Sequence, residues 1–89
     1  MSIDLKFNNN FSYNFTENCL RIFVLDSEGK ENYDNVYYVK LSKISIIRPN
    51  PNEKSLTIYL TDTTSITFEN HPAMGLFVED LVGHWDSKI

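Results

Sequence analysis

The chain is poor in cysteine, glycine and histidine. Of its 89 residues, one is cysteine, three are glycine and two are histidine. A single cysteine excludes an intramolecular disulfide, which is typical of a protein from a reducing compartment. The glycines, Gly29, Gly75 and Gly83, are isolated, so the chain has no glycine-rich phosphate loop. We therefore do not expect a nucleotide-binding enzyme.

Long apolar runs and an excess of basic residues are also lacking. No stretch approaches the roughly 18 consecutive apolar residues of a membrane span, and the first residues do not resemble a secretion signal. We expect a cytoplasmic protein that is neither secreted nor inserted in a membrane. Twelve acidic and eight scattered basic residues give a net charge of −4. This charge disfavours nucleic acid and anionic membranes and favours a protein partner with a basic surface.

Residues that could perform catalysis or bind a metal are few. A catalytic nucleophile needs a base within reach, and a metal site needs three or four converging ligands. The candidates are Cys19, His71 and His84, which show no ligand-type spacing. We interpret His71 as a helix cap or a solvent-facing residue, His84 as a surface or boundary residue and Cys19 as a small buried side chain. The sequence therefore predicts a protein that is not an enzyme and has no metal and no cofactor.

Hydrophobic patterning typical of β-strands fills the first three quarters of the chain. Apolar residues at every second position indicate a strand with one buried face, and a continuous apolar run indicates a strand covered on both faces. Proline cannot donate to a strand ladder, so Pro49 must end its strand or lie in an edge strand. The predicted strands are residues 3–7, 11–15, 20–25, 36–41, 44–47, 56–60 and 66–68.

Polar segments between these strands predict three hairpins. Asparagine favours turns, so residues 8–10 predict a first hairpin that joins the two N-terminal strands. The polar cluster 26–32 predicts a second hairpin, between strands 20–25 and 36–41. Residues 61–64 predict a third, between strands 56–60 and 66–68.

Beyond Asn70 the hydrophobic spacing changes to three and four residues, which indicates an amphipathic helix. We predict a helix over residues 72–86, capped by Asn70 or His71 and with Pro72 near its first position. Leu76 lies on the face opposite the apolar stripe. The stripe consists of Met74, Phe77, Val78, Leu81, Val82 and Trp85.

These elements predict a single α+β domain over residues 1–89, an antiparallel sheet or roll of about five to seven short strands closed by one C-terminal amphipathic helix. In arrangement, residues 20–85 resemble the pleckstrin-homology-like roll, in which a helix plugs one end of a bent antiparallel sheet. Phosphoinositide-binding members of that family carry a basic cluster around their first hairpin, and here only Lys6 lies near residues 8–10. The resemblance therefore implies a fold and not lipid recognition.

The densest acidic cluster lies in and beside the turn of the predicted second hairpin, and tyrosines flank it. Tyrosine is an efficient interface anchor, and complementary charge accelerates encounter with a partner. We predict that this region contacts a basic protein site, with a purely solubilising loop as the alternative. The predicted contact residues are Asp26, Glu28, Glu31, Tyr33, Asp34, Tyr37 and Tyr38.

The leading functional hypothesis is a non-enzymatic protein-binding module that acts by surface complementarity. A specific version is a small phage or mobile-element inhibitor of a host protein such as a defence nuclease, although a charge of −4 is modest for a DNA mimic. One alternative is a self-associating assembly component that forms a homodimer through a strand edge or the helix flank at Leu76. Another is a small ligand-binding roll or enzyme, which needs a pocket with a strongly perturbed titratable group.

Overall fold

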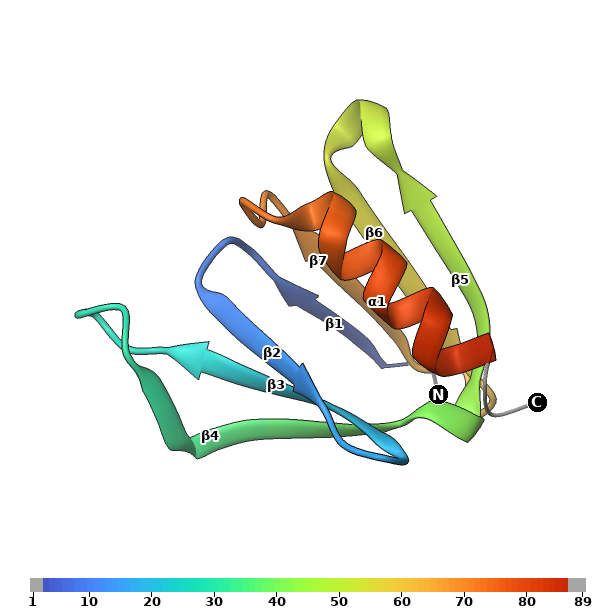
Figure 1. Ribbon diagram of the computed structural model, residues 1–89, viewed down its shortest axis with the longest axis horizontal. Helices are drawn as coiled ribbons and strands as arrows, with labels where there is room; N and C mark the ends of the chain where they lie inside the picture. The colour runs from blue at the N-terminus through green and yellow to red at the C-terminus, as the bar shows by residue number, and fades with distance from the viewer. Residues whose placement is uncertain (1–2, 87–89) are drawn as a thin grey trace.

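In the computed structural model, which describes residues 3–86, seven strands form two sheets and an α-helix follows the last strand (Figure 1). The α+β class, the strand-rich order and the C-terminal helix are confirmed. Short 3-10 turns lie at Leu41–Lys43 and Pro51–Glu53. The elements are β1 (Asp4–Phe7), β2 (Phe11–Phe15), β3 (Cys19–Leu25), β4 (Glu31–Lys40), β5 (Ile44–Asn50), β6 (Ser55–Leu60), β7 (Ser65–Glu69) and α1 (Met74–Asp86).

The strands divide into a four-stranded sheet of order β1-β7-β6-β5 and a three-stranded sheet of order β2-β3-β4. Figure 1 shows the two sheets inclined to one another, with α1 in front of β6 and β7. The sheets do not close into a barrel, because the edge strands of one sheet, β1 and β5, do not pair with those of the other, β2 and β4. The molecule is therefore a two-sheet arrangement in which a single core lies between the sheets and α1.

The predicted first hairpin is wrong, because β1 and β2 belong to different sheets. β1 pairs with β7 in parallel, with Leu5 opposite Ile66 and Phe7 opposite Phe68. This register puts the apolar side chains of β1 on the inner face, where Phe7 is only 6% exposed. The prediction of an all-antiparallel sheet is wrong for the same reason: pairing with β7 makes the four-stranded sheet mixed.

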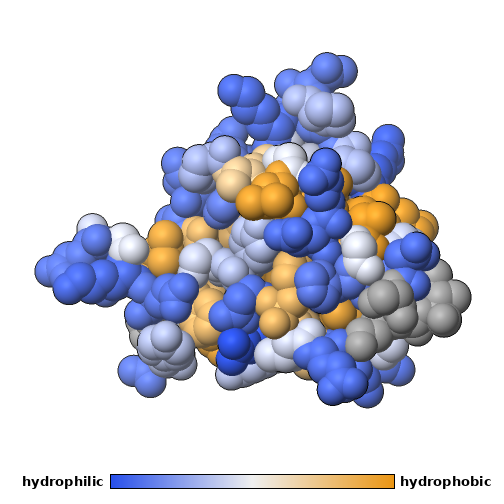
Figure 2. All heavy atoms as spheres, viewed as in Figure 1, coloured by the Kyte–Doolittle hydropathy of each residue, from blue (hydrophilic) through white to orange (hydrophobic). Residues whose placement is uncertain are grey.

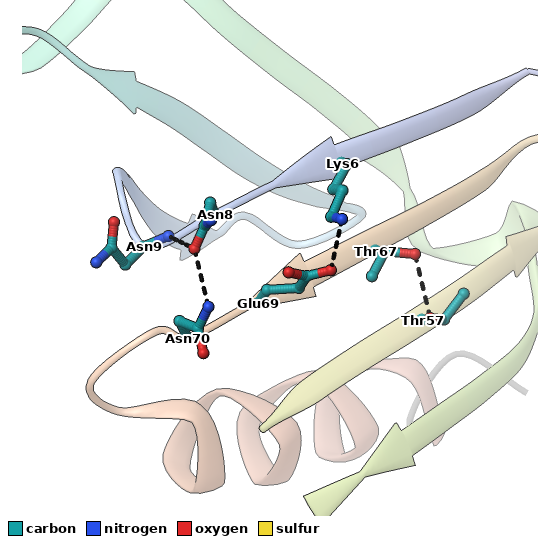
Figure 3. Close-up of polar contacts among 7 residues, drawn as sticks. All are labelled: Lys6, Asn8, Asn9, Thr57, Thr67, Glu69 and Asn70. Carbon is teal, nitrogen blue, oxygen red and sulfur yellow. Dashed lines mark hydrogen bonds and ion pairs between the residues drawn. The ribbon is translucent and has the colours of Figure 1, made fainter. Parts of the chain in front are cut away.

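The asparagine turn carries the chain from one sheet to the other (Figure 3). The side-chain oxygen of Asn8 accepts hydrogen bonds from the Asn9 backbone N–H at 2.9 Å and from the Asn70 side-chain nitrogen at 3.1 Å. Nearby, Lys6 Nζ lies 3.0 Å from a carboxylate oxygen of Glu69. These contacts fasten the crossing to the end of β7, although the exposed ion pair itself contributes little.

The other two predicted hairpins are confirmed, and two further antiparallel pairs accompany them. β3 pairs with β4, and β6 pairs with β7. β2 also pairs with β3, and β5 with β6. β5 extends through Pro49 and is an edge strand, as the proline requires.

The helix begins two residues later than predicted, and five of the six residues of the predicted stripe lie in the core or pack against it. Phe77 and Leu81 are fully buried. Val82 departs from the stripe, with 39% of its surface exposed, and Leu76 is exposed on the opposite face as expected. Half-buried Trp85 donates its ring N–H to the backbone oxygen of Ile44 at 2.9 Å. The end of α1 is thereby bonded to the start of β5.

The core contains residues from both sheets and from α1. Aromatic rings of the two sheets and the helix meet at its centre: Phe77 lies 4.9 Å from Phe68 and 5.9 Å from Phe11, between ring centroids. The cluster consists of Phe7, Phe11, Leu20, Ile22, Val39, Leu41, Ile44, Leu56, Ile58, Ile66, Phe68, Phe77 and Leu81.

Replacing Trp85 tests the bond between α1 and β5. We expect Trp85→Phe to lower the free energy of unfolding by about 1 kcal/mol or more, because the Ile44 carbonyl loses its donor while most of the ring packing remains. Leu76→Ala, on the exposed face of the same helix, should change it by no more than about 0.5 kcal/mol. Urea unfolding monitored by circular dichroism measures both. Equal losses in the two variants would contradict the assignment.

Candidate functional site

The β3–β4 hairpin projects from one end of the molecule, and Figure 2 shows this end as hydrophilic. Its turn is organised by Asp26, whose Oδ1 accepts the backbone N–H groups of Glu28 at 2.9 Å and Lys30 at 3.0 Å. Gly29 has a φ of +78°, which glycine adopts without strain. Glu28 lies 3.6 Å from the Lys30 ammonium. Two of the four predicted carboxylates are thus engaged within the turn.

Glu31 occupies the outward face of the three-stranded sheet and is held by two donors. Its Oε1 accepts the Ser12 hydroxyl at 3.0 Å, and its Oε2 accepts the Tyr33 hydroxyl at 3.3 Å. The two donors come from strands β2 and β4, so the carboxylate has a defined position although its residue is exposed. Such a carboxylate can accept a cationic donor with little further ordering.

Phe23 lies on the same outward face, outside the core, and only 2% of its surface is exposed. The edge of the Tyr33 ring packs against it at 5.3 Å, and the Arg21 guanidinium lies 5.7 Å from its centre. Arg21 Nε also donates to Asn14 Oδ1 at 2.6 Å. The apolar run of residues 20–25 predicts a strand covered on both faces. On the outward face, the side chains of Tyr33 and Arg21 cover Phe23.

The three predicted tyrosines divide between the two faces of the sheet. Tyr33 and Tyr38 are 76% and 67% exposed. Tyr37 faces inward, where its ring lies 5.1 Å from that of Phe7 in an edge-to-face arrangement. Asp34 is exposed in the strand between them. The structure therefore leaves Glu31, Tyr33, Asp34 and Tyr38 exposed on β4 and packs Tyr37 against Phe7.

Two of the four edge strands, β4 and β5, are irregular, which obstructs strand addition there. Phe23 pairs with Val36, and the next pair is Leu25 with Glu31. Between these two pairs β3 advances by two residues and β4 by five, so the register of the β3–β4 ladder is irregular there. The β5 edge has a shift after Ile44 and contains Pro49. Bulges and proline obstruct pairing with a further strand. The hairpin therefore offers its side chains to a partner more readily than its backbone.

Both histidines are packed on aromatic rings of β2. His71 Nδ1 accepts the Ala73 backbone N–H at 3.0 Å, and its ring centroid lies 4.7 Å from that of Phe11. Ala73 directly precedes the first residue of α1, Met74, so this bond stabilises the turn that leads into the helix. Burial lowers the pKa of His71. The His84 ring stacks on Phe15 at 4.2 Å with the planes nearly parallel. Cys19 is half-buried.

Two hollows in the structure were not predicted. A groove of about 820 Å³ lies between the β5–β6 turn and the first turns of α1, and a cleft of about 340 Å³ lies between the two sheets. Each is built from segments far apart in the sequence, so no local pattern signals it. The groove is lined by Pro49, Pro51, Lys54, Ser55, Asn70, His71, Pro72, Met74, Gly75, Val78 and Glu79.

Comparisons with known proteins give no relative: no family model, no curated protein and no solved structure matches this chain. Within residues 3–86, no group of three or more histidine, cysteine, aspartate or glutamate side chains is placed to hold a metal ion. No helix in the same range is long and apolar enough to cross a bilayer.

The lowered pKa of His71 predicts a pH-dependent stability. The fold favours the neutral ring, so its contribution is complete above the unfolded-state pKa of about 6.5 and is lost as the pH falls below that value. We expect His71→Asn, which retains an acceptor for the Ala73 amide, to lose less stability than the parent between about pH 7.5 and pH 5.5. Urea unfolding at several pH values measures this. Equal pH dependence in the two proteins would contradict it.

Proposed function

We propose that this protein is a non-enzymatic binding module that recognises another protein through the outward face of the β3–β4 hairpin. We call the four residues Glu31, Tyr33, Asp34 and Tyr38 the tyrosine face. The observation that supports the proposal most directly is the 76% and 67% exposure of Tyr33 and Tyr38 beside a carboxylate held by hydrogen bonds. Exposed aromatic side chains grouped on one surface are typical of protein interaction sites.

The physical character of the tyrosine face suits a protein partner. Tyrosine presents a large amphipathic surface and loses little conformational entropy when it is bound. The Tyr33 ring is supported from beneath by Phe23 at 5.3 Å, so its position is partly set before binding. Preorganised side chains of this kind lose less freedom on association, which strengthens binding.

The charge of the region supports a partner with a basic surface. Glu31 and Asp34 lie on the tyrosine face, and Glu28 lies near it in the turn. With a net charge of −4, the protein attracts a basic surface at long range, and complementary charge raises the association rate. A specific version of the proposal is a cytoplasmic inhibitor from a phage or mobile element that covers a basic site of a host protein such as a nuclease.

The likeness to a pleckstrin-homology-like roll belongs to the same proposal. The C-terminal helix packed against two inclined sheets supports it, whereas the parallel pairing of β1 with β7 departs from a fully antiparallel roll. Proteins of one fold host many functions, so this likeness does not specify what the tyrosine face binds.

Self-association is the second proposed function, and a cross-strand pair on the four-stranded sheet favours it. Ile46 and Tyr59 lie opposite one another in the β5–β6 register and are 55% and 36% exposed. If this pair formed a homodimer interface, light scattering would give a dimer mass that Ile46→Ser reduces to that of the monomer. A monomer at all concentrations of the parent protein would exclude this function.

A site-specific crosslink tests the tyrosine face as a contact surface. With a photo-crosslinking phenylalanine analogue in place of Tyr38, we expect one dominant protein adduct in extract from the native cells. The same analogue in place of Tyr59, on the other sheet, should give no such adduct. Gel electrophoresis followed by mass spectrometry of the adduct measures the result. The same adduct from both positions, or from neither, would count against the proposal.

Once the crosslink has identified the partner, binding to that partner, purified by itself, tests the individual residues. We expect Tyr33→Ala combined with Tyr38→Ala to weaken binding at least about tenfold, because aromatic anchors carry much of an interface's energy. Glu31→Gln combined with Asp34→Asn should slow association, most clearly at low salt. The matched charge control is Glu17→Gln combined with Glu53→Gln, and Asp26 is left unchanged because it organises the turn. Isothermal titration and stopped-flow fluorescence measure these effects, and unaffected binding in the tyrosine variant refutes the assignment.

A further inference from the structure

The cleft between the two sheets lies where β1 and β4 approach without pairing. Its volume is about 340 Å³. At one end, the rings of Phe7 and Tyr37 meet at 5.1 Å and bridge the two strands. The lining residues come from β1, β4, the segment after β4, the β6–β7 turn and β7: Leu5, Tyr37, Tyr38, Val39, Lys40, Lys43, Leu60, Thr61, Asp62, Thr64 and Ile66.

The walls of the cleft are largely apolar. Val39 and Ile66 are buried at the edge of the core, with 5% and 2% of their surfaces exposed. Leu5 and Leu60 are half-buried and therefore still have apolar surface that water reaches. Covering such surface with an apolar group is favourable in proportion to the area removed from water.

The charged residues of the lining leave an excess of positive charge. They are Lys40, Lys43 and Asp62, two cations against one carboxylate. Asp62 Oδ1 already accepts the Thr64 backbone N–H at 3.0 Å within its own turn. Among residues 3–86, the ion pairs involve Lys6 and Lys30, and neither lysine of the cleft takes part in one. Hydrogen bonds with Thr64 and, to a smaller extent, the charge of Lys43 lower the pKa of Asp62, so Lys43 is partly neutralised within the cleft. The cleft thus combines an apolar wall with an excess of one positive charge.

We propose that this cleft binds a small amphipathic carboxylate, with its apolar body between β1 and β4 and its carboxylate at Lys40 and Lys43. The volume is at the lower end of the roughly 300 to 1,000 Å³ typical of small-molecule sites, which fits a short acyl or aryl acid and not a folded segment. The charge of the lining selects an anionic end over a cationic one. This site overlaps the tyrosine face at Tyr38, and the other three residues of that face lie outside its lining.

Nuclear magnetic resonance titration of the full chain with sodium octanoate tests the proposal. We expect the amide signals of Leu5, Val39, Leu60 and Ile66 to shift together and to saturate. Lys40→Gln combined with Lys43→Gln should weaken octanoate binding at least about fivefold, because the carboxylate loses both cations. The matched control, Lys30→Gln combined with Lys54→Gln, removes the same charge elsewhere and should leave the affinity within about twofold.

The uncharged analogue 1-octanol separates the contribution of the carboxylate from that of the acyl chain. We expect octanol to shift the same amides with an affinity at least about fivefold lower, and the double cleft variant to bind octanol and octanoate alike. Three outcomes would overturn the proposal. In the first, octanoate shifts no amide signal of the cleft residues. In the second, the amide signals that it shifts belong to residues of the groove beside α1. In the third, the control variant loses as much affinity for octanoate as the cleft variant. These outcomes leave the proposed protein-binding function untouched, because Glu31 and Tyr33 lie outside the cleft.

Discussion

The parallel pairing of β1 with β7 is the constraint on which the rest of the structure depends. It joins the first strand to the last, so both ends of the strand-rich region contribute to one sheet. The register places Phe7 beside Phe68, where the two rings stack at 5.6 Å, and closes that side of the core. Because β1 is used in this way, the asparagine turn must cross between sheets, and β1 and β4 are left as neighbouring edges that do not pair.

The outward face of the β3–β4 hairpin is exposed because the single α-helix of the described residues, α1, packs on the inner side of the two sheets. α1 packs on the inner side, with Phe77 and Leu81 fully buried, and no other element of residues 3–86 covers the outward face of the three-stranded sheet. Phe23 on that face is shielded by its neighbours alone, chiefly the ring of Tyr33 and the guanidinium of Arg21. Tyr33, which shields Phe23, is itself 76% exposed, which is why an aromatic side chain is presented to solvent there.

Patterns within short segments predicted most of the elements and only part of the candidate site. The second and third hairpins and the helix were predictable because each is specified by periodicity and turn residues close in sequence. The first hairpin was not, because adjacent strands can pair with each other or with distant partners and alternation alone does not distinguish the two. Likewise, all seven contact candidates were visible as an acidic, tyrosine-rich stretch, but only the register of β4 separated outward Tyr38 from inward Tyr37.

The sequence by itself determined where strands and helix form, which helix face is buried and that the net charge is −4, because these depend on local spacing and composition. Tertiary structure alone decided that Leu5 pairs beside Ile66, that Asp26 organises a turn while Glu31 holds a place on an open face, and that a cleft lies between the sheets. The physical reason is that pairing partners and hollows arise from residues distant along the chain. Their proximity is set by how the whole core packs, which no single segment encodes.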